Sequence, residues 1–114
     1  MIKIYHNPRC SKSRQTLALL EAQQVDHSVI EYLKTPPGKS ELKDILKKLN
    51  KEPLEIMRKK EKIMDKLNID LTSKSDVELI DLIIKHPILL ERPIVVTDED
   101  ARIGRPPESV LELF

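Results

Sequence analysis

The chain has 114 residues, of which 39% are hydrophobic and 34% charged, with a net charge of +1. This composition is ordinary for one globular domain and gives no reason to expect a nucleic-acid or membrane partner. Two tyrosines, one phenylalanine and no tryptophan are too few for a platform that stacks bases. No apolar run approaches the roughly 20 residues of a membrane span, and the first residues turn polar too early for a signal peptide. A lone cysteine cannot form an internal disulfide, so we expect a cytoplasmic protein.

The first third of the chain has the pattern of a strand–helix–strand unit. Residues 2–5 alternate and are β-branched or aromatic, which predicts a short strand. After the turn signal Asn7-Pro8, a helix is predicted from Cys10 or Ser11 to about Gln23. Residues 25–32 predict a second strand, which such a unit places parallel to the first.

The middle of the chain, about residues 36–88, has helical patterns. Ser40 is predicted to cap a helix whose apolar face carries Leu42, Ile45, Leu46 and Leu49. Pro53 fits the first position of a short helix, and residues 63–67 continue a helical segment. Ser75 and Glu78 form a predicted capping box, and the helix that follows should end at His86-Pro87.

The last stretch predicts a hairpin and a closing helix. Residues 94–97 are typical of a buried strand, 98–100 of a turn and 102–103 of a partner strand, with a helix from about Glu108. The resulting βαβ and ββα halves predict an α/β fold, a thioredoxin-like mixed four-stranded sheet with a helical insert between the halves. We expect residues 1–114 to form a single domain of this kind.

Cys10 has the surroundings of a reactive thiol. It lies at a predicted helix N-terminus, where amide groups favour negative charge, and Arg9, Lys12 and Arg14 are close in sequence. The alternative is a buried structural cysteine, which the proline turn and the neighbouring charges disfavour.

Several cysteine chemistries are excluded by the spacing. Ser13 occupies the second position of a Cys-x-x-Cys pair, and Thr16 stands where a phosphatase-type loop needs arginine. His6, His27 and His86 are too scattered to form a zinc site with one cysteine, so no metal is expected. Papain-type catalysis stays open without a local signature.

Arg92 and Arg105 each directly precede a proline at the edges of the predicted hairpin. Guanidinium groups bind tetrahedral oxyanions through two parallel hydrogen bonds, as lysine cannot. The alternative is surface ion pairing, because Glu91 adjoins Arg92 and Glu108 is near Arg105.

Three motifs together resemble one known family. HNPRC followed by SKSR and a leucine helix, then ERPIVVT, then GRPPE near the C-terminus, are similar to the glutathione/glutaredoxin-coupled arsenate reductases of the ArsC family. The resemblance covers essentially the whole chain, in the same order and spacing.

The resemblance implies a role for eight residues. Cys10 would be the nucleophile, His6 would help to keep it a thiolate, and Pro93 would be the cis proline of thioredoxin-like sites. The substrate oxyanion, arsenate or a similar one, would be bound by the anion loop and three arginines: Asn7, Ser13, Arg58, Arg92 and Arg105.

The resemblance also implies external reductants. Gly104 stands where some members have a second cysteine, so glutathione would serve as co-substrate, glutaredoxin as partner protein, and no cofactor would be bound. Two alternatives remain open at this point. One is an Spx-type redox regulator that binds RNA polymerase, although Cys-Ser-Lys-Ser replaces its Cys-x-x-Cys; the other is a glutathione-dependent thiol oxidoreductase with another substrate.

Overall fold

The computed structural model describes residues 2–114. Its strands and α-helices are, in chain order, β1 (Ile2–His6), α1 (Ser11–Ala22), β2 (His27–Glu31), α2 (Lys39–Leu49), α3 (Lys62–Leu67), α4 (Asp76–Lys85), β3 (Ile94–Val96) and β4 (Ala101–Ile103). Short 3-10 helices span Pro53–Ile56, Leu71–Ser73, Pro87–Leu89 and Pro107–Leu113. The predicted order of elements and the α/β class are confirmed.

The chain divides into two compact units. One contains the chain up to Pro36 together with Arg92–Phe114, and the other is Pro37–Glu91. The second unit occupies the segment in which the sequence predicts a helical insert, and we call it the insert. The description of the chain as one domain stays a prediction.

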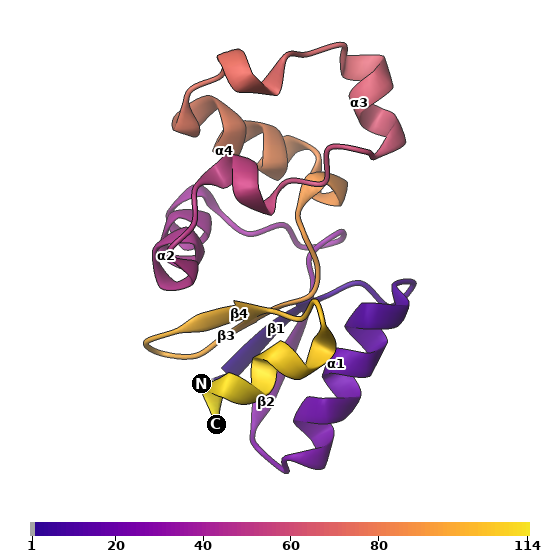
Figure 1. Ribbon diagram of the computed structural model, residues 1–114, viewed down its shortest axis with the longest axis vertical. Coiled ribbons are helices and arrows are strands. Elements are labelled where there is room, and N and C mark those ends of the chain that lie inside the picture. Colours follow the sequence, from indigo (N-terminus) through magenta and orange to yellow (C-terminus); the bar gives the residue numbers. More distant parts are fainter. Residues whose placement is uncertain (1) are drawn as a thin grey trace. The chain divides into compact units, whose positions relative to one another are not determined.

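The first unit is built on a four-stranded mixed sheet with strand order β2-β1-β3-β4 (Figure 1). β1 pairs parallel with β2 and antiparallel with β3, and β3 pairs antiparallel with β4. The central position of β1 puts Ile4 opposite Val29 on one side and Val95 on the other. The predicted thioredoxin-like sheet is therefore confirmed, including the parallel βαβ pair.

One face of this sheet is covered by α1 and the C-terminal 3-10 helix, which lie side by side (Figure 1). Their shared core is a cluster of fully buried side chains from β1, α1, β3 and the 3-10 helix: Ile4, Leu20, Val95 and Val110. Each such side chain contributes about 1.5–3 kcal/mol by leaving water. This packing holds β1 and α1, the two elements that flank Cys10, against one another.

The first helix of the insert begins earlier than the sequence predicts. The predicted N-cap, Ser40, is wrong: Gly38 is the N-cap, and Ser40 already lies inside α2. The Gly38 N–H donates to Glu41 Oε1 at 3.4 Å. The Glu41 carboxylate thus accepts the N–H of the N-cap residue at the positive end of the helix dipole, which is the half of a capping box that the third helical residue supplies.

The cap of α4 follows the prediction. The Glu78 N–H donates to Ser75 Oγ at 3.2 Å, and the Ser75 N–H donates to Glu78 Oε1 at 3.0 Å. The helix ends at Lys85, directly before His86-Pro87, as expected. Within the insert, α2 buries Leu42 and Ile45 while α4 buries Ile80 and Ile83.

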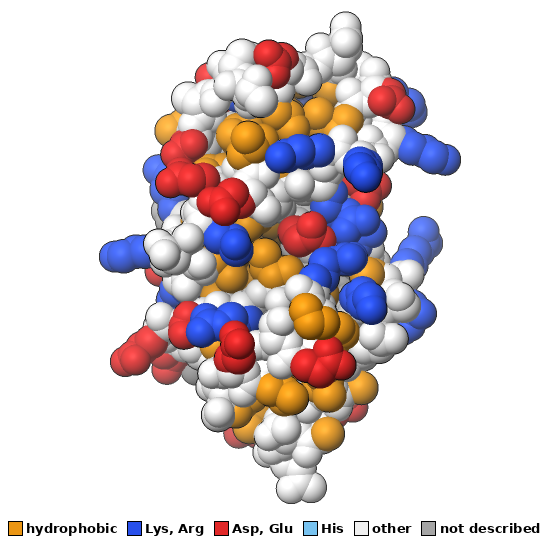
Figure 2. All heavy atoms as spheres, in the orientation of Figure 1, with side chains coloured by type: hydrophobic (Ala, Val, Ile, Leu, Met, Phe, Trp, Pro, Cys, Tyr) orange, Lys and Arg blue, Asp and Glu red, His pale blue; other side chains and the backbone are white. Residues whose placement is uncertain are grey.

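No helix within residues 2–114 is long and apolar enough to cross a membrane. On the face drawn in Figure 2, basic and acidic side chains are intermixed, as the net charge of +1 would suggest.

Candidate active site

A tight loop connects β1 to α1 and presents Cys10. The Cys10 N–H donates to the Asn7 carbonyl at 3.0 Å, and the Asn7 side-chain oxygen accepts the Arg9 N–H at 3.0 Å. Cys10 is the N-cap of α1, with extended backbone angles (φ −96°, ψ 123°) and a partly exposed side chain. The thiol therefore sits at the positive end of the helix dipole and can be reached from solvent.

A buried serine at the start of α1 holds the loop in place. Ser13 is fully buried, and its Oγ accepts the Asn7 N–H at 3.0 Å and lies 2.6 Å from His6 Nδ1. His6 and Asn7 are themselves only 5% and 4% exposed. Since unpaired polar groups in such a place are costly, this group specifies one loop geometry.

His6 is held in its neutral form more strongly than a free histidine. Burial lowers its pKa and is the largest cause; the charge of Glu31 raises the pKa by less than burial lowers it, and the charge of Arg14 lowers it by a smaller amount. A neutral imidazole beside Ser13 orients the loop. The expected role of His6 in maintaining the thiolate stays a prediction, and its contact with Ser13 is the route by which it would act.

The environment of Cys10 favours the thiolate. Burial by itself raises the pKa of the thiol, but the backbone N–H groups of Ser13 and Lys12 and the guanidinium of Arg92 outweigh it and bring the pKa below its ordinary value. Sγ does not meet hydrogen-bond geometry to cap the helix, so the amides act as nearby dipoles. Arg92 acts through both a hydrogen bond and its charge.

A second guanidinium also reaches the sulfur. Arg105 Nη2 donates to Cys10 Sγ over 3.7 Å, while its Nε donates to the Arg92 carbonyl at 2.8 Å. That second bond ties the orientation of Arg105 to the backbone of Arg92. Two arginines 13 positions apart in the sequence are thus held on one thiol.

The prolines after these arginines have unusual peptide bonds. The Arg92–Pro93 bond is cis, as the resemblance implies, and the Arg105–Pro106 bond is cis as well, which the sequence analysis did not anticipate.

Gly104 is packed too closely to carry a side chain. Its N–H donates to the Pro93 carbonyl at 2.9 Å. A Cβ at this position would lie 2.5 Å from Thr16 Oγ1 and 2.8 Å from Pro93 Cγ. The glycine permits α1, Pro93 and the end of β4 to approach, and so sets the position of Arg105.

Arg58 lies in the insert and is held by two carboxylates. Its Nε donates to Glu61 Oε1 at 2.7 Å and its Nη1 to Glu91 Oε1 at 3.1 Å. Burial lowers the pKa of Arg58, but the two carboxylates outweigh it and raise the pKa overall. Glu91 therefore pairs with a distant arginine, which the sequence analysis did not foresee.

The structure thus gathers seven of the eight predicted site residues in one unit, whereas Arg58 belongs to the insert. The seven are His6, Asn7, Cys10, Ser13, Arg92, Pro93 and Arg105. Sequence reasoning missed Thr16 and Gly104, which shape the site without reacting, and the Arg14 Nη1 bond to the Pro8 carbonyl at 2.9 Å that braces the loop. The glycine beside Arg105 was the one signal available for this packing.

The arrangement suits nucleophilic attack on an anion. A thiolate is the reactive form of cysteine, and two guanidinium groups beside it can neutralise a tetrahedral oxyanion. Within residues 2–114, no three His, Cys, Asp or Glu side chains come together in a way that could hold a metal ion.

A cysteine at the start of α1, beside a mixed sheet with a cis proline before β3, defines a thioredoxin-like α/β protein. The chain belongs to the ArsC family, whose model matches residues 5–113. The motif-based resemblance to this family is confirmed.

Individual relatives extend over nearly the full chain. Escherichia coli K12 protein YfgD is 50% identical over 113 residues, which is 98% of this chain and 95% of that protein. An arsenate reductase of Haemophilus influenzae is 46% identical over 112 residues, or 97% of each. The solved arsenate reductase of Vibrio cholerae superposes with a TM-score of 0.93 at 49% identity, covering 99% of this chain and 97% of that one.

Proposed function

We propose that this protein is an arsenate reductase in which Cys10 is the nucleophile and glutathione and glutaredoxin supply the electrons. The observation that carries the proposal is the thiol of Cys10, whose pKa is lowered by Arg92 and the first amides of α1 and which Arg105 also contacts. Relatives that are 46% identical and named arsenate reductases support the choice of oxyanion.

Arsenate would bind where the loop and the arginines present donors to its oxygens. Arg92 and Arg105 neutralise part of its charge, and the loop residues Asn7 and Ser13 keep the donors in place. Arg58 is the third arginine of the proposed set. Such fixed donors lower the barrier because they are in position before charge moves.

In the first step, the Cys10 thiolate attacks arsenic and an arsenate oxygen leaves as water after protonation. A sulfur–arsenic bond forms and an arsenic–oxygen bond breaks, and arsenic stays in the +5 state. The proposed role of His6 is to keep the loop oriented through Ser13 during this attack.

In the second step, a glutathione thiolate attacks Sγ of Cys10. The electron pair of the sulfur–arsenic bond passes to arsenic, which leaves as arsenite in the +3 state. Two thiols are thereby oxidised to one Cys10–glutathione disulfide, so the two electrons gained by arsenic are accounted for.

Glutaredoxin would then regenerate the enzyme. Its thiolate attacks the glutathione sulfur of the mixed disulfide and releases the Cys10 thiolate as leaving group, by ordinary thiol–disulfide exchange. Cys10 is the one cysteine of the chain, so no second thiol of the same chain can carry out this step.

The test is arsenite production from arsenate with glutathione and glutaredoxin present. Cys10→Ser should lower kcat by roughly a thousandfold or more, because a hydroxyl is a far weaker nucleophile than a thiolate. Ser11→Ala, next to Cys10 on the exposed side of α1, is the matched control and should retain turnover. Absence of arsenite with the wild type, or full activity of Cys10→Ser, would overturn the proposal.

A further inference from the structure

A buried threonine on α1 is bonded to the first turn of the helix, beside the reactive cysteine. Thr16 is fully buried, and its hydroxyl donates to the Lys12 carbonyl at 2.8 Å. That carbonyl belongs to the same peptide group as the N–H of Ser13. We propose that Thr16 is a positioning residue for Cys10, whose hydroxyl orients and polarises the Lys12–Ser13 peptide and so helps its N–H to stabilise the thiolate. The inference rests on the proposed function, because it concerns the thiolate that attacks arsenate.

The Ser13 amide is one of the free donors at the start of α1. Amides of the first helical turn have no acceptor within the helix, and the helical ladder begins with the Arg14 N–H, which donates to the Cys10 carbonyl at 3.0 Å. Burial has the largest effect on the pKa of the thiol and raises it, and the Ser13 amide is the next largest single cause and lowers it. Thr16 therefore contacts a peptide group to which the charge on sulfur is sensitive.

The hydroxyl can act on the sulfur through this peptide because successive hydrogen bonds polarise one another. The Lys12 carbonyl accepts the Thr16 N–H, as α-helical geometry requires, and the Thr16 hydroxyl in addition. A second donor on the carbonyl oxygen draws electron density from the peptide nitrogen and makes the Ser13 N–H a stronger donor. Such strengthening amounts to roughly 10–30% per bond. The bonds thus connect the Thr16 hydroxyl, the Lys12–Ser13 peptide and the sulfur of Cys10.

The orientation of the Thr16 side chain is held by its contact with Gly104. A Cβ on Gly104 would lie 2.5 Å from Thr16 Oγ1 and 3.1 Å from Thr16 Cγ2, so both branches of the threonine pack against the glycine. A β-branched side chain has few rotamers in a helix, and this packing keeps the hydroxyl on Lys12. The residue after Gly104 is Arg105, which contacts Cys10 Sγ. One close approach therefore positions both the hydroxyl and the arginine.

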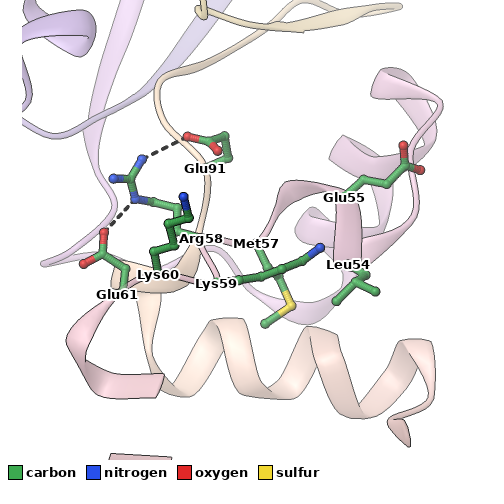
Figure 3. A pocket seen from close by; sticks show the side chains of 8 residues that line it. All are labelled: Leu54, Glu55, Met57, Arg58, Lys59, Lys60, Glu61 and Glu91. Carbon is green, nitrogen blue, oxygen red and sulfur yellow. Dashed lines mark hydrogen bonds and ion pairs between the residues drawn. The ribbon is translucent and has the colours of Figure 1, made fainter. Parts of the chain in front are cut away.

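A substitution at Thr16 changes none of the charged or titratable groups around the thiol. These groups come from β1, the loop, α1, the neighbouring strand β2 and the residues before β3 and after β4: His6, Arg9, Lys12, Arg14, Glu31, Arg92 and Arg105. Arg58 of the insert donates to Glu61 and Glu91 (Figure 3), and these bonds do not involve Thr16. A change in the titration of Cys10 would therefore report the peptide and not a change of charge.

The test is the pH dependence of Cys10 alkylation by iodoacetamide in Thr16→Val. Valine keeps the branched shape that packs against Gly104 but has no hydroxyl, so the midpoint should rise by about half a pH unit. Below the midpoint, alkylation should then be roughly threefold slower. Thr16→Ser keeps the hydroxyl and should retain the wild-type midpoint, although it lacks a buried methyl group. The matched control is Thr97→Val, which removes a hydroxyl in the turn after β3 and should leave the midpoint unchanged.

Two outcomes would overturn the inference. An unchanged midpoint in Thr16→Val would show that the hydroxyl does not act on the thiol. A shift in Thr16→Ser as large as that in Thr16→Val would show that packing, and not the hydroxyl, is responsible. If Thr16→Val does not fold, NMR of the wild type decides. The Thr16 hydroxyl proton should exchange slowly with water and shift with the Cys10 midpoint, and a hydroxyl proton that exchanges fast or does not titrate would contradict the inference.

Alkylation separates this inference from the proposed function, because iodoacetamide requires neither arsenate nor glutathione. A raised midpoint in Thr16→Val, together with no arsenite production by the wild type, would refute the reductase and keep the role of Thr16. Arsenite production by the wild type with an unchanged midpoint in Thr16→Val would keep the reductase and refute the role of Thr16.

Discussion

The charged groups around Cys10 and those around Arg58 are arranged in opposite ways. At Cys10, the groups that act on the thiol are backbone amides and the guanidinium groups of Arg92 and Arg105. No Asp or Glu stands between Asn7 and Leu20 in the sequence. In the insert, both hydrogen bonds of Arg58 end on carboxylates. The first environment stabilises a negative charge that develops there, whereas the second keeps a cation fixed and locally neutralised.

The two glycines of the chain differ in how closely they are packed. Replacing each with alanine should give the largest difference in unfolding free energy between the two units. Gly104→Ala places a methyl group against Thr16 and Pro93 and should lower the free energy of unfolding by about 3 kcal/mol, the upper end of the usual cost of overpacking. Gly38→Ala in the insert meets nothing within 4 Å and should change it by less than about 1 kcal/mol. Urea denaturation measures both, and equal losses would contradict the packing described at Gly104.

Removal of the hydroxyl beneath the Cys10 loop should have the next largest effect. Ser13→Ala leaves the buried Asn7 N–H and His6 Nδ1 without their partner, which should cost about 2 kcal/mol of unfolding free energy. Ser11→Ala, on an exposed side chain two positions earlier, is the control and should be nearly neutral. If the two variants unfold at the same urea concentration, Ser13 does not fix the loop.

The pH dependence of Cys10 tests the electrostatic half of the comparison. The alkylation rate of Cys10 by iodoacetamide should rise with pH through a midpoint below the ordinary thiol pKa. Arg92→Ala removes a positive charge that favours the thiolate, so the midpoint should move to higher pH. At pH 7 the alkylation should be roughly tenfold slower. A midpoint that stays in place would show that Arg92 does not act on the sulfur.

The smallest effect is expected for the anchors of Arg58. Glu91→Gln keeps the shape of the side chain but removes the charge from a half-buried pair, and should lower the unfolding free energy by about 1 kcal/mol. Asp81→Asn breaks the exposed pair with Lys39 and should have no measurable effect. Thermal unfolding of the two variants distinguishes them, and an equal change would show that the Arg58 pair contributes no more than a surface pair.

Local sequence patterns predicted which elements form, but not the exact start of α2 or the helix type of the closing segment. The alternation of residues 2–5 and the Ser75 capping box gave β1 and the start of α4 because both depend on neighbours in sequence. The predicted N-cap at Ser40 was wrong because the helix begins at Lys39 with Gly38 as its N-cap, and Glu41 accepts the N–H of Gly38. The closing helix begins close to the predicted residue but is of the 3-10 type.

The candidate site likewise combines residues that the sequence identifies with contacts that depend on the fold. Cys10 and the arginines before prolines could be identified from residue type, spacing and resemblance. The contact of Ser13 with His6 and the partners of Arg58 could not, since they depend on side chains that folding brings together across 7 and 33 positions. The close approach at Gly104 likewise depends on α1 and Pro93 meeting.

The central claim is that Cys10 reacts with arsenate and then with glutathione. Intact-protein mass spectrometry after one turnover, without glutaredoxin, tests it most directly. The proposed mechanism predicts the mass of one added glutathione on Cys10, formed only when arsenate is present, with one arsenite released per adduct. Arsenite released without the adduct, or an adduct that forms equally fast without arsenate, would contradict it.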